Sequence, residues 1–137
     1  MSDIFNLQRF VSAQDLVYSR VLGELRGGRK YTHWMWFVFP QAAGLGRSAM
    51  AQKYAIASLD EAKAYLEHPL LGGRMRECTQ LVLDVEGRSA REIFGQPDDQ
   101  KFWSSMTLFK YAMPEDALFR DTLRKYFDGK DDPGTLE

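Results

Sequence analysis

The sequence predicts an all-α fold, an irregular cluster of about six to eight helices in a single domain. Three observations carry this prediction. Helix-capping signals recur along the chain with short connections between them, and the apolar residues between them follow helical spacing. A third is that no stretch alternates apolar and polar residues as a half-buried strand would. With 137 residues, 45% of them hydrophobic, the chain has the length of one ordinary domain with one sizeable core.

The N-terminal part predicts a helical stripe that ends at a glycine pair. Leu7, Phe10 and Val11 begin the stripe, and Ser12 followed by Asp15 has the form of a capping box, so a new or re-aimed helix is expected to start at Ser12. Gly27-Gly28 then ends the helix. We interpret the pair as a C-cap, the alternative being a backbone nest for an anion.

We expect the central stretch from Arg29 to Gln41 to form the centre of the core, since it contains six consecutive large apolar residues, Trp34–Phe39. Such a short run fits a buried strand or a short buried helix. We expect a helix because a solitary strand would have no partner strand to bond with. Thr32 is a candidate cap at its start, and Pro40 stops either element.

The rest of the chain predicts a succession of capped helices. Their expected starts are Ser48, Ser58, Pro69 at a first helical position, Ser89 with Glu92 in a capping box, and Asp98 as a cap; the last helix stops at Gly129. A polar, acidic tail follows from about residue 130, in which Leu136 can fold back onto the domain.

Charge and cysteine content exclude several classes. The net charge of −1 argues against a nucleic-acid or membrane-surface protein, and no apolar run approaches the roughly 20 residues of a membrane helix. Cys78, the lone cysteine, allows no internal disulfide, and the start of the chain lacks a secretory signal, so we expect a cytoplasmic protein. Positive charge is concentrated between Gly23 and Lys53, where an anionic ligand would bind most readily.

Three segments are candidates for chemistry, and the first is the glycine loop Gly44–Ala49. It spells the dinucleotide-binding pattern G-x-G-x-x-A, but it does not follow a strand directly and no further βαβ unit is visible. A plain surface turn is one interpretation. The other is an anion site formed by backbone N–H groups with Gln41, Arg47 and Ser48.

The second candidate is His33 with its neighbours. The other histidine, His68, stands before Pro69, and neither has a Cys or His at metal-ligand spacing, so we expect no metal and no cofactor. His33 is either a structural residue or a proton-transfer group. A cation, a phenol and flat rings beside it suit an anionic or aromatic ligand; these are Arg29, Lys30, Tyr31, Trp34 and Trp36.

The third candidate is the segment from Asp98 to Phe109. Asp98 and Asp99 are explained by helix capping or, alternatively, as a general base; Lys101 and Ser105 share the helix face of Asp98 and could hold a phosphate. Neither Ser104 nor Ser105 lies in a nucleophile elbow, so a covalent serine mechanism is not expected.

These motifs together resemble the mostly bacterial family catalogued as domain of unknown function 1810. The resemblance spans most of the chain and implies an all-helical domain without an established activity; its members are often labelled calpastatin, but this chain lacks repeated inhibitory segments. The matching phrases are Gly28–Gln41, Gly44–Ala51, Ser58–Ala62, Tyr65–Pro69, Ile93–Asp99 and Ser104–Phe109.

More loosely, Gly28-x-x-Tyr31 and Trp103-x-x-Met106 resemble landmarks of the NADAR proteins, which act on ADP-ribose-like N-glycosides. The acidic residue that adjoins a histidine in that family's first motif is absent here, which leaves the catalytic group unassigned and Asp98 or Asp99 as a substitute. Two functions are therefore expected. One is binding, and hydrolysis in the NADAR manner, of a nucleotide-like or phosphorylated metabolite; the alternative is a protein-interaction module that uses the exposed part of the aromatic cluster. The oligomeric state is open.

Overall fold

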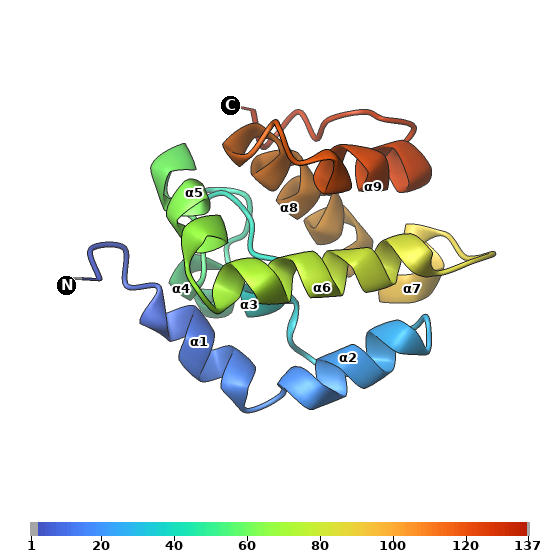
Figure 1. Cartoon of the computed structure of the whole chain (residues 1–137), viewed down its shortest axis with the longest axis horizontal. Helices are drawn as coiled ribbons and strands as arrows, with labels where there is room; N and C mark the ends of the chain where they lie inside the picture. Colours follow the sequence, from blue (N-terminus) through green and yellow to red (C-terminus); the bar gives the residue numbers. More distant parts are fainter. Residues whose placement is uncertain (1–2, 137) are drawn as a thin grey trace.

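The computed structural model describes residues 3–136, which form nine helices and no strand (Figure 1). The helical prediction is confirmed, and the predicted count of six to eight is too low by one. The helices are α1 (Gln8–Asp15), α2 (Tyr18–Arg26), α3 (Met35–Val38), α4 (Ala49–Lys53), α5 (Leu59–Glu67), α6 (Leu71–Asp84), α7 (Ala90–Phe94), α8 (Asp98–Ala112) and α9 (Ala117–Phe127). No helix in this part of the chain has the length and apolar composition to cross a membrane.

The helices enclose one hydrophobic core. Figure 1 shows α6 across the middle of the molecule, with α2 below it and α9 above. Helix α8 packs against α3, α5, α7 and α9, so most of its side chains are buried. Two buried hydroxyls of α8 have acceptors one turn earlier in the same helix: Ser104 Oγ lies 3.1 Å from the Gln100 carbonyl oxygen, and Thr107 donates to the Trp103 carbonyl at 2.9 Å.

The first two helices meet at a bend that the sequence places elsewhere. Ser12 lies inside α1, and the break falls at Leu16 and Val17, so a helix start at Ser12 is wrong. The bend is held from α6: Arg74 pairs with Asp15 at 2.8 Å and lies over the Tyr18 ring at 4.6 Å. Tertiary contacts on both sides of the break thus override the local capping signal.

The central apolar run forms the short buried helix that the sequence predicts. Trp34 and Phe39 are fully buried, and Phe39 meets Phe102 of α8 edge to face at 4.9 Å. Thr32 is not its cap: the residue before the helix is Trp34, and the Thr32 hydroxyl donates to Glu24 instead. The run is therefore a centre of the core.

Most of the predicted caps are confirmed. The hydroxyls of Ser48, Ser58 and Ser89 accept from backbone N–H groups in the first turns of α4, α5 and α7, and Ser89 forms the full capping box with Glu92. These contacts are local in sequence, which is why the pattern predicts them.

Two predicted starts differ. Helix α6 begins at Leu71 and not at Pro69, because the Nδ1 atom of His68 accepts from the N–H groups of Leu70 and Leu71 at 3.1 and 3.2 Å. Asp98 is the first residue of α8 and not its cap, because the N-cap position is occupied by Pro97. The Asp98 carboxylate pairs instead with Lys30, which is distant in sequence.

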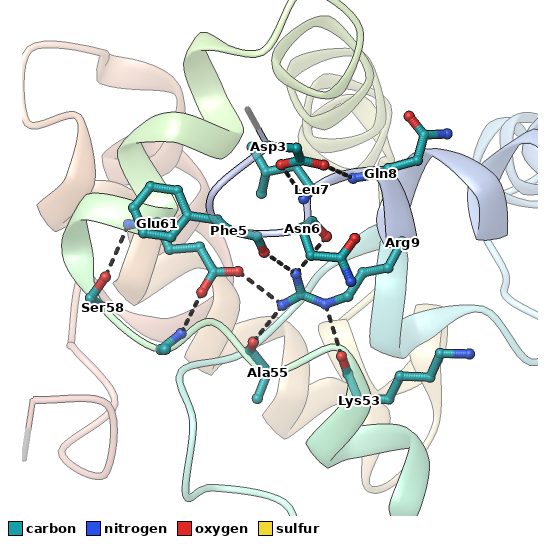
Figure 2. A network of polar contacts seen from close by, with 11 residues as sticks. Asp3, Phe5, Asn6, Leu7, Gln8, Arg9, Lys53, Ala55, Ser58 and Glu61 are labelled. Carbon is teal, nitrogen blue, oxygen red and sulfur yellow. Dashed lines mark hydrogen bonds and ion pairs between the residues drawn. The ribbon is translucent and has the colours of Figure 1, made fainter. Parts of the chain in front are cut away.

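Arg9 joins the N-terminal segment to the linker between α4 and α5 (Figure 2). Its guanidinium pairs with the Glu61 carboxylate at 2.9 Å, and both side chains are largely buried. Glu61 also accepts from the Ala57 N–H at 2.9 Å. The other four acceptors of Arg9 are carbonyl oxygens at 2.6 to 2.9 Å, those of Phe5, Asn6, Lys53 and Ala55.

The acidic C-terminal segment, residues 130–136, is fastened to α8. Asp131 pairs with Lys110 and accepts from the Tyr111 hydroxyl at 2.5 Å. Asp132 accepts from the Ser104 hydroxyl at 2.5 Å, and its own N–H donates to the Thr107 hydroxyl at 3.0 Å. The segment is therefore part of the folded domain, and Leu136 remains half exposed at its end.

Candidate functional site

The segment that carries most of the predicted site residues begins at the end of α2. Gly28 has a φ of +76°, and around it the Arg29 N–H donates to the Glu24 carbonyl at 3.1 Å while the Gly28 N–H donates to the Leu25 carbonyl at 3.0 Å. This is the Schellman arrangement of a helix C-terminus. The predicted C-cap is thus confirmed over the anion nest.

The side chain of Glu24 fixes the next residues. Oε1 accepts from the backbone N–H groups of Tyr31 and Thr32 at 2.7 and 3.1 Å and from Trp34 Nε1 at 3.0 Å, and Oε2 accepts from the Thr32 hydroxyl at 2.6 Å. Burial of the carboxyl opposes its ionisation, but these hydrogen bonds outweigh that effect and lower the pKa of Glu24 below its ordinary value. The sequence analysis did not identify Glu24 as a site residue. The available signal was that Glu24 is the single acidic residue among five basic ones between Gly23 and Lys53.

Lys30, Asp98 and Lys101 form what we call the lysine–aspartate cluster. Lys30 Nζ lies 2.7 Å from Asp98 Oδ2, and Lys101 Nζ lies 3.6 Å from Asp98 Oδ1. The two ammonium groups also lie over indole rings, Lys30 over Trp34 at 5.2 Å and Lys101 over Trp36 at 5.3 Å. The structure therefore brings together five of the predicted site residues from segments about 70 positions apart.

The cluster neutralises much of its own charge. The Lys30 side chain is 7% exposed and pairs with Asp98, whose two carboxylate oxygens are divided between the two lysines. Trp34 is fully buried, so its ring meets Lys30 and no dissolved ligand. The cluster joins the α2–α3 connection to the start of α8. The neighbouring arginines take no part in these ion pairs and remain available to an anion.

Those arginines surround what we call the cationic hollow, a surface depression of about 290 Å³ between the α2–α3 connection and α7. The connection is joined to α7 by a hydrogen bond from the Lys30 N–H to the Ile93 carbonyl at 2.7 Å. Within residues 3–136, no ion pair engages any of the three arginines of the hollow. The residues that line it are Arg29, Lys30, Arg88, Arg91, Glu92 and the segment 93–95.

Neighbouring groups hold two of these arginines without neutralising them. Arg91 donates to the Gln96 side-chain oxygen at 3.0 Å, and the Arg29 guanidinium lies 5.6 Å from the centre of the Tyr31 ring, which is 72% exposed. Sequence reasoning missed Arg88 and Arg91. Arg88 directly precedes the Ser89–Glu92 capping box and Arg91 lies within it, but nothing in the chain order placed that box beside Arg29.

The remaining candidates for proton transfer lie apart. His33 is exposed and has no hydrogen-bond partner among the residues that the structure describes. The Asp99 carboxylate accepts from the Gln100 N–H at 2.9 Å and faces a shallow depression beside Trp103 and Phe127. Ser105 is fully buried, and its hydroxyl has no partner within the described chain. None of the three faces the cationic hollow.

The glycine loop also lies apart from the cluster. Ser48 caps α4 and Arg47 is exposed, and in the described part of the chain no hydrogen bond or ion pair joins either residue, or Gln41, to the lysine–aspartate cluster. The loop follows an isolated parallel bridge between Ala42 and Ile56, not a sheet. A dinucleotide-binding fold is therefore absent from residues 3–136.

No group of three or more potential metal ligands occurs among residues 3–136. The described part of the chain thus offers one charged hollow and, beside it, one partly neutralised cluster, with no group of three or more potential metal ligands.

Comparison with known proteins decides the family. The model of the family described as "Protein of unknown function (DUF1810)" matches residues 4–137. The chain belongs to the DUF1810 family. A search of curated proteins gives no match. The likeness to NADAR proteins stays a prediction that these findings do not test.

A solved structure supports the fold of this DUF1810 protein. It is similar to the crystal structure, at 1.38 Å, of the conserved hypothetical protein Rv1873 from Mycobacterium tuberculosis. The two are 57% identical with a TM-score of 0.96, over 98% of this chain and 96% of the other. That protein too is described without a function, so its likeness supports the fold and identifies no ligand.

Proposed function

We propose that this DUF1810 protein binds a small anionic metabolite, phosphorylated or nucleotide-like, in the cationic hollow. One observation carries the proposal: Arg29, Arg88 and Arg91 meet around one depression without a carboxylate pairing with them in the described chain. Natural surfaces usually intersperse charges of opposite sign, and guanidinium groups suit phosphate oxygens because their donors form a rigid fork.

The charge of the hollow sets the charge of the ligand. Three guanidinium groups face one carboxylate, that of Glu92, which is already the acceptor of the Ser89 N–H at 2.8 Å. Lys30 is offset by Asp98. The net charge is close to +2, which matches a phosphate monoester at neutral pH. The exposed Tyr31 ring beside Arg29 provides a flat surface for a base or another ring.

Binding is better supported than hydrolysis. For N-glycoside cleavage a carboxylate must activate water next to the ligand. Lys30 lines the hollow and pairs with Asp98, which does not line it. Asp98 would therefore be available as a base only if the ligand drew Lys30 away from it. Catalysis by Asp98, or by Asp99 or His33, thus requires a rearrangement on binding.

The alternative, a protein-interaction module, rests on exposed aromatic side chains. Of the central cluster, Trp34 and Phe39 are fully buried, and only Tyr31 and part of Trp36 are accessible within the described residues. Two partly isolated rings form a small patch compared with the roughly 800 Å² per partner of a standard interface. The structure therefore favours the small anion.

Calorimetric titration tests the proposal directly. Inorganic phosphate, adenosine monophosphate, ADP-ribose and sugar phosphates are titrated at low salt, with adenosine as the uncharged comparison. Arg88→Ala and Arg91→Ala should each weaken anion binding about tenfold or more, because each removes a charge-assisted hydrogen bond of roughly 1.5–3 kcal/mol. Binding should also weaken as salt is added.

The matched control is Arg120→Ala, an exposed arginine of α9 outside the hollow. It should leave affinity unchanged. If no anion binds the wild-type protein, or if Arg120→Ala has the same effect as Arg88→Ala, the hollow is not the site. Release of product from ADP-ribose that disappears in Asp98→Asn, with binding retained, would extend the proposal to hydrolysis.

A further inference from the structure

A second hollow lies on the other side of the molecule, and we call it the apolar hollow. It has a volume of about 360 Å³ and is bounded by the start of α5, the second half of α8, residues 42–43 and the C-terminal segment. Leu108, in its wall, follows Asp98 by ten residues on α8, which is about 15 Å at ~1.5 Å per residue. Figure 1 shows α5 and α7 at opposite sides, so the two hollows are separate.

Exposed apolar side chains converge on this hollow. Leu59, Tyr111 and Leu136 all line it, and they are 46%, 42% and 54% exposed. Beneath them Leu108 and Ile56 are buried. Single exposed apolar residues are common on protein surfaces, but three around one concavity form an apolar patch that folding leaves partly uncovered.

The polar groups at the edge of the apolar hollow differ in whether they still have a hydrogen to donate to a ligand. The hydroxyls of Tyr111 and Thr135 already donate, to Asp131 at 2.5 Å and to Asp132 at 2.7 Å. The Ser58 oxygen accepts from the Glu61 N–H at 3.1 Å, and its own hydrogen has no acceptor among residues 3–136. Leu59 is the first residue of α5, where N–H groups lack acceptors within the helix. The edge at α5 therefore offers donors.

We propose that the apolar hollow binds a small amphipathic molecule with an apolar chain or ring and one terminal carbonyl or carboxylate oxygen. The apolar part lies against Leu59, Leu108, Tyr111 and Leu136, and the oxygen accepts from Ser58 and the first turn of α5. The C-terminal segment, held to α8 through Asp131 and Asp132, forms the outer wall of the site.

The size and enclosure of the hollow favour a small molecule over a partner chain. Its volume lies at the lower end of the roughly 300–1,000 Å³ of small-molecule sites and equals about twelve water molecules at ~30 Å³ each. A partner helix, about 10 Å across, needs an open groove. Here the chain's own residues Thr135 and Leu136 close one side.

Titration with three homologous series tests this site: n-alkanoates, primary alkanamides and alkylamines of four to ten carbons, all below their aggregation concentrations. Affinity for the first two should rise about fourfold per methylene group until the hollow is full and then level off. The amines, which carry no acceptor, should bind at least tenfold more weakly. Because the amides are uncharged, their binding cannot come from the cationic hollow.

Two variants in the hollow and one control outside it locate the site. Ala57→Phe places a ring in the hollow from an exposed position and should abolish saturable binding, whereas Ala117→Phe, at an exposed position on α9, should not. Leu136→Ala removes part of the outer wall at the end of the chain and should weaken binding several-fold even if Ala57→Phe fails to fold.

The proposal is overturned if affinity does not depend on chain length, if the amines bind as well as the amides, or if Ala57→Phe and Ala117→Phe behave alike. It is also overturned if the wild-type chain is a dimer that Ala57→Phe or Leu136→Ala converts to a monomer, since the hollow would then be a subunit interface. Phosphate binding that is lost in Arg88→Ala tests the cationic hollow separately, so the failure of either proposal leaves the other standing.

Discussion

Replacing Glu24 tests whether one carboxylate organises the segment that carries the candidate site. In Glu24→Ala the N–H groups of Tyr31 and Thr32, the Thr32 hydroxyl and the Trp34 indole N–H all lose their acceptor. Water can reach the first three. The indole belongs to a fully buried side chain, so its N–H is left without a partner.

The size of the effect follows from these bonds. An unsatisfied buried donor costs about 1–3 kcal/mol, and hydrogen bonds to a charged group contribute roughly 1.5–3 kcal/mol each before water replaces them. We expect Glu24→Ala to lower the free energy of unfolding by about 3–4 kcal/mol. Glu24→Gln keeps a carbonyl oxygen and the shape of the side chain, so we expect about 1–2 kcal/mol.

The pH dependence supplies a second, independent measurement. Because the pKa of Glu24 in the folded protein lies below its ordinary value of 4.5, its contribution to stability is fully present above pH 4.5 and is lost as the pH falls through the folded-state pKa. The difference in stability between the wild type and Glu24→Gln should therefore shrink on acidification.

Urea unfolding followed by tryptophan fluorescence measures both effects. With an m-value of about 2 kcal/mol/M, a loss of ~3 kcal/mol moves the midpoint by about 1.5 M. The control is Glu67→Gln, an exposed glutamate of α5, for which we expect a change within about 0.5 kcal/mol. A Glu24→Ala midpoint equal to that of the wild type would refute the role that we assign to this carboxylate.

Three further predictions follow from other contacts. Arg9→Lys should lower the free energy of unfolding, measured in urea, by about 3 kcal/mol. The lysine ammonium has three donors for the five oxygen atoms that now accept from the Arg9 guanidinium, and it leaves Glu61 poorly paired. A loss below about 1 kcal/mol would contradict this. Burial raises the pKa of Cys78 to about 12, so a thiol reagent at pH 8 should label it only at the rate of unfolding, and rapid labelling of the folded protein would contradict its burial. Burial opposes ionisation of Asp131, but hydrogen bonds from Lys110 and Tyr111 outweigh it and lower the pKa of Asp131 below its ordinary 3.8. Asp131→Asn should therefore reduce stability slightly at pH 7, by less than about 1 kcal/mol; the difference should shrink as the pH falls below 3.8 and disappear below the folded-state pKa, whereas a difference that persists in stronger acid would show that charge is not its cause.

The hydrogen-bond and ion-pair partners of the predicted capping residues explain which capping predictions fail. Ser12, Thr32 and Asp98 all stand where a capping residue would stand, yet Thr32 donates to Glu24 and Asp98 pairs with Lys30. Conversely His68, with no capping pattern, accepts from the start of α6. A capping pattern shows what a side chain can bond locally. Competition from residues distant in sequence decides whether it does so.

The candidate site shows the same limit. The sequence placed Arg29, Lys30 and the aromatic residues in one segment, because neighbours in sequence remain neighbours in space. It could not add Arg88 and Arg91, which reach the hollow because α7 lies beside the α2–α3 connection, where the Lys30 N–H donates to the Ile93 carbonyl.

The sequence by itself determined the features that depend on local spacing. These are the helical class, the caps at Ser48, Ser58 and Ser89, the glycine end of α2 and the burial of the Trp34–Phe39 run apart from Trp36. All of them follow from contacts within a few residues or from the apolar character of the side chains. The tertiary structure alone decided which charges are neutralised and which are free. A charged side chain reaches partners from any part of the chain. Glu24 therefore accepts hydrogen bonds from the α2–α3 connection, Asp98 pairs with two lysines, and three arginines face one hollow.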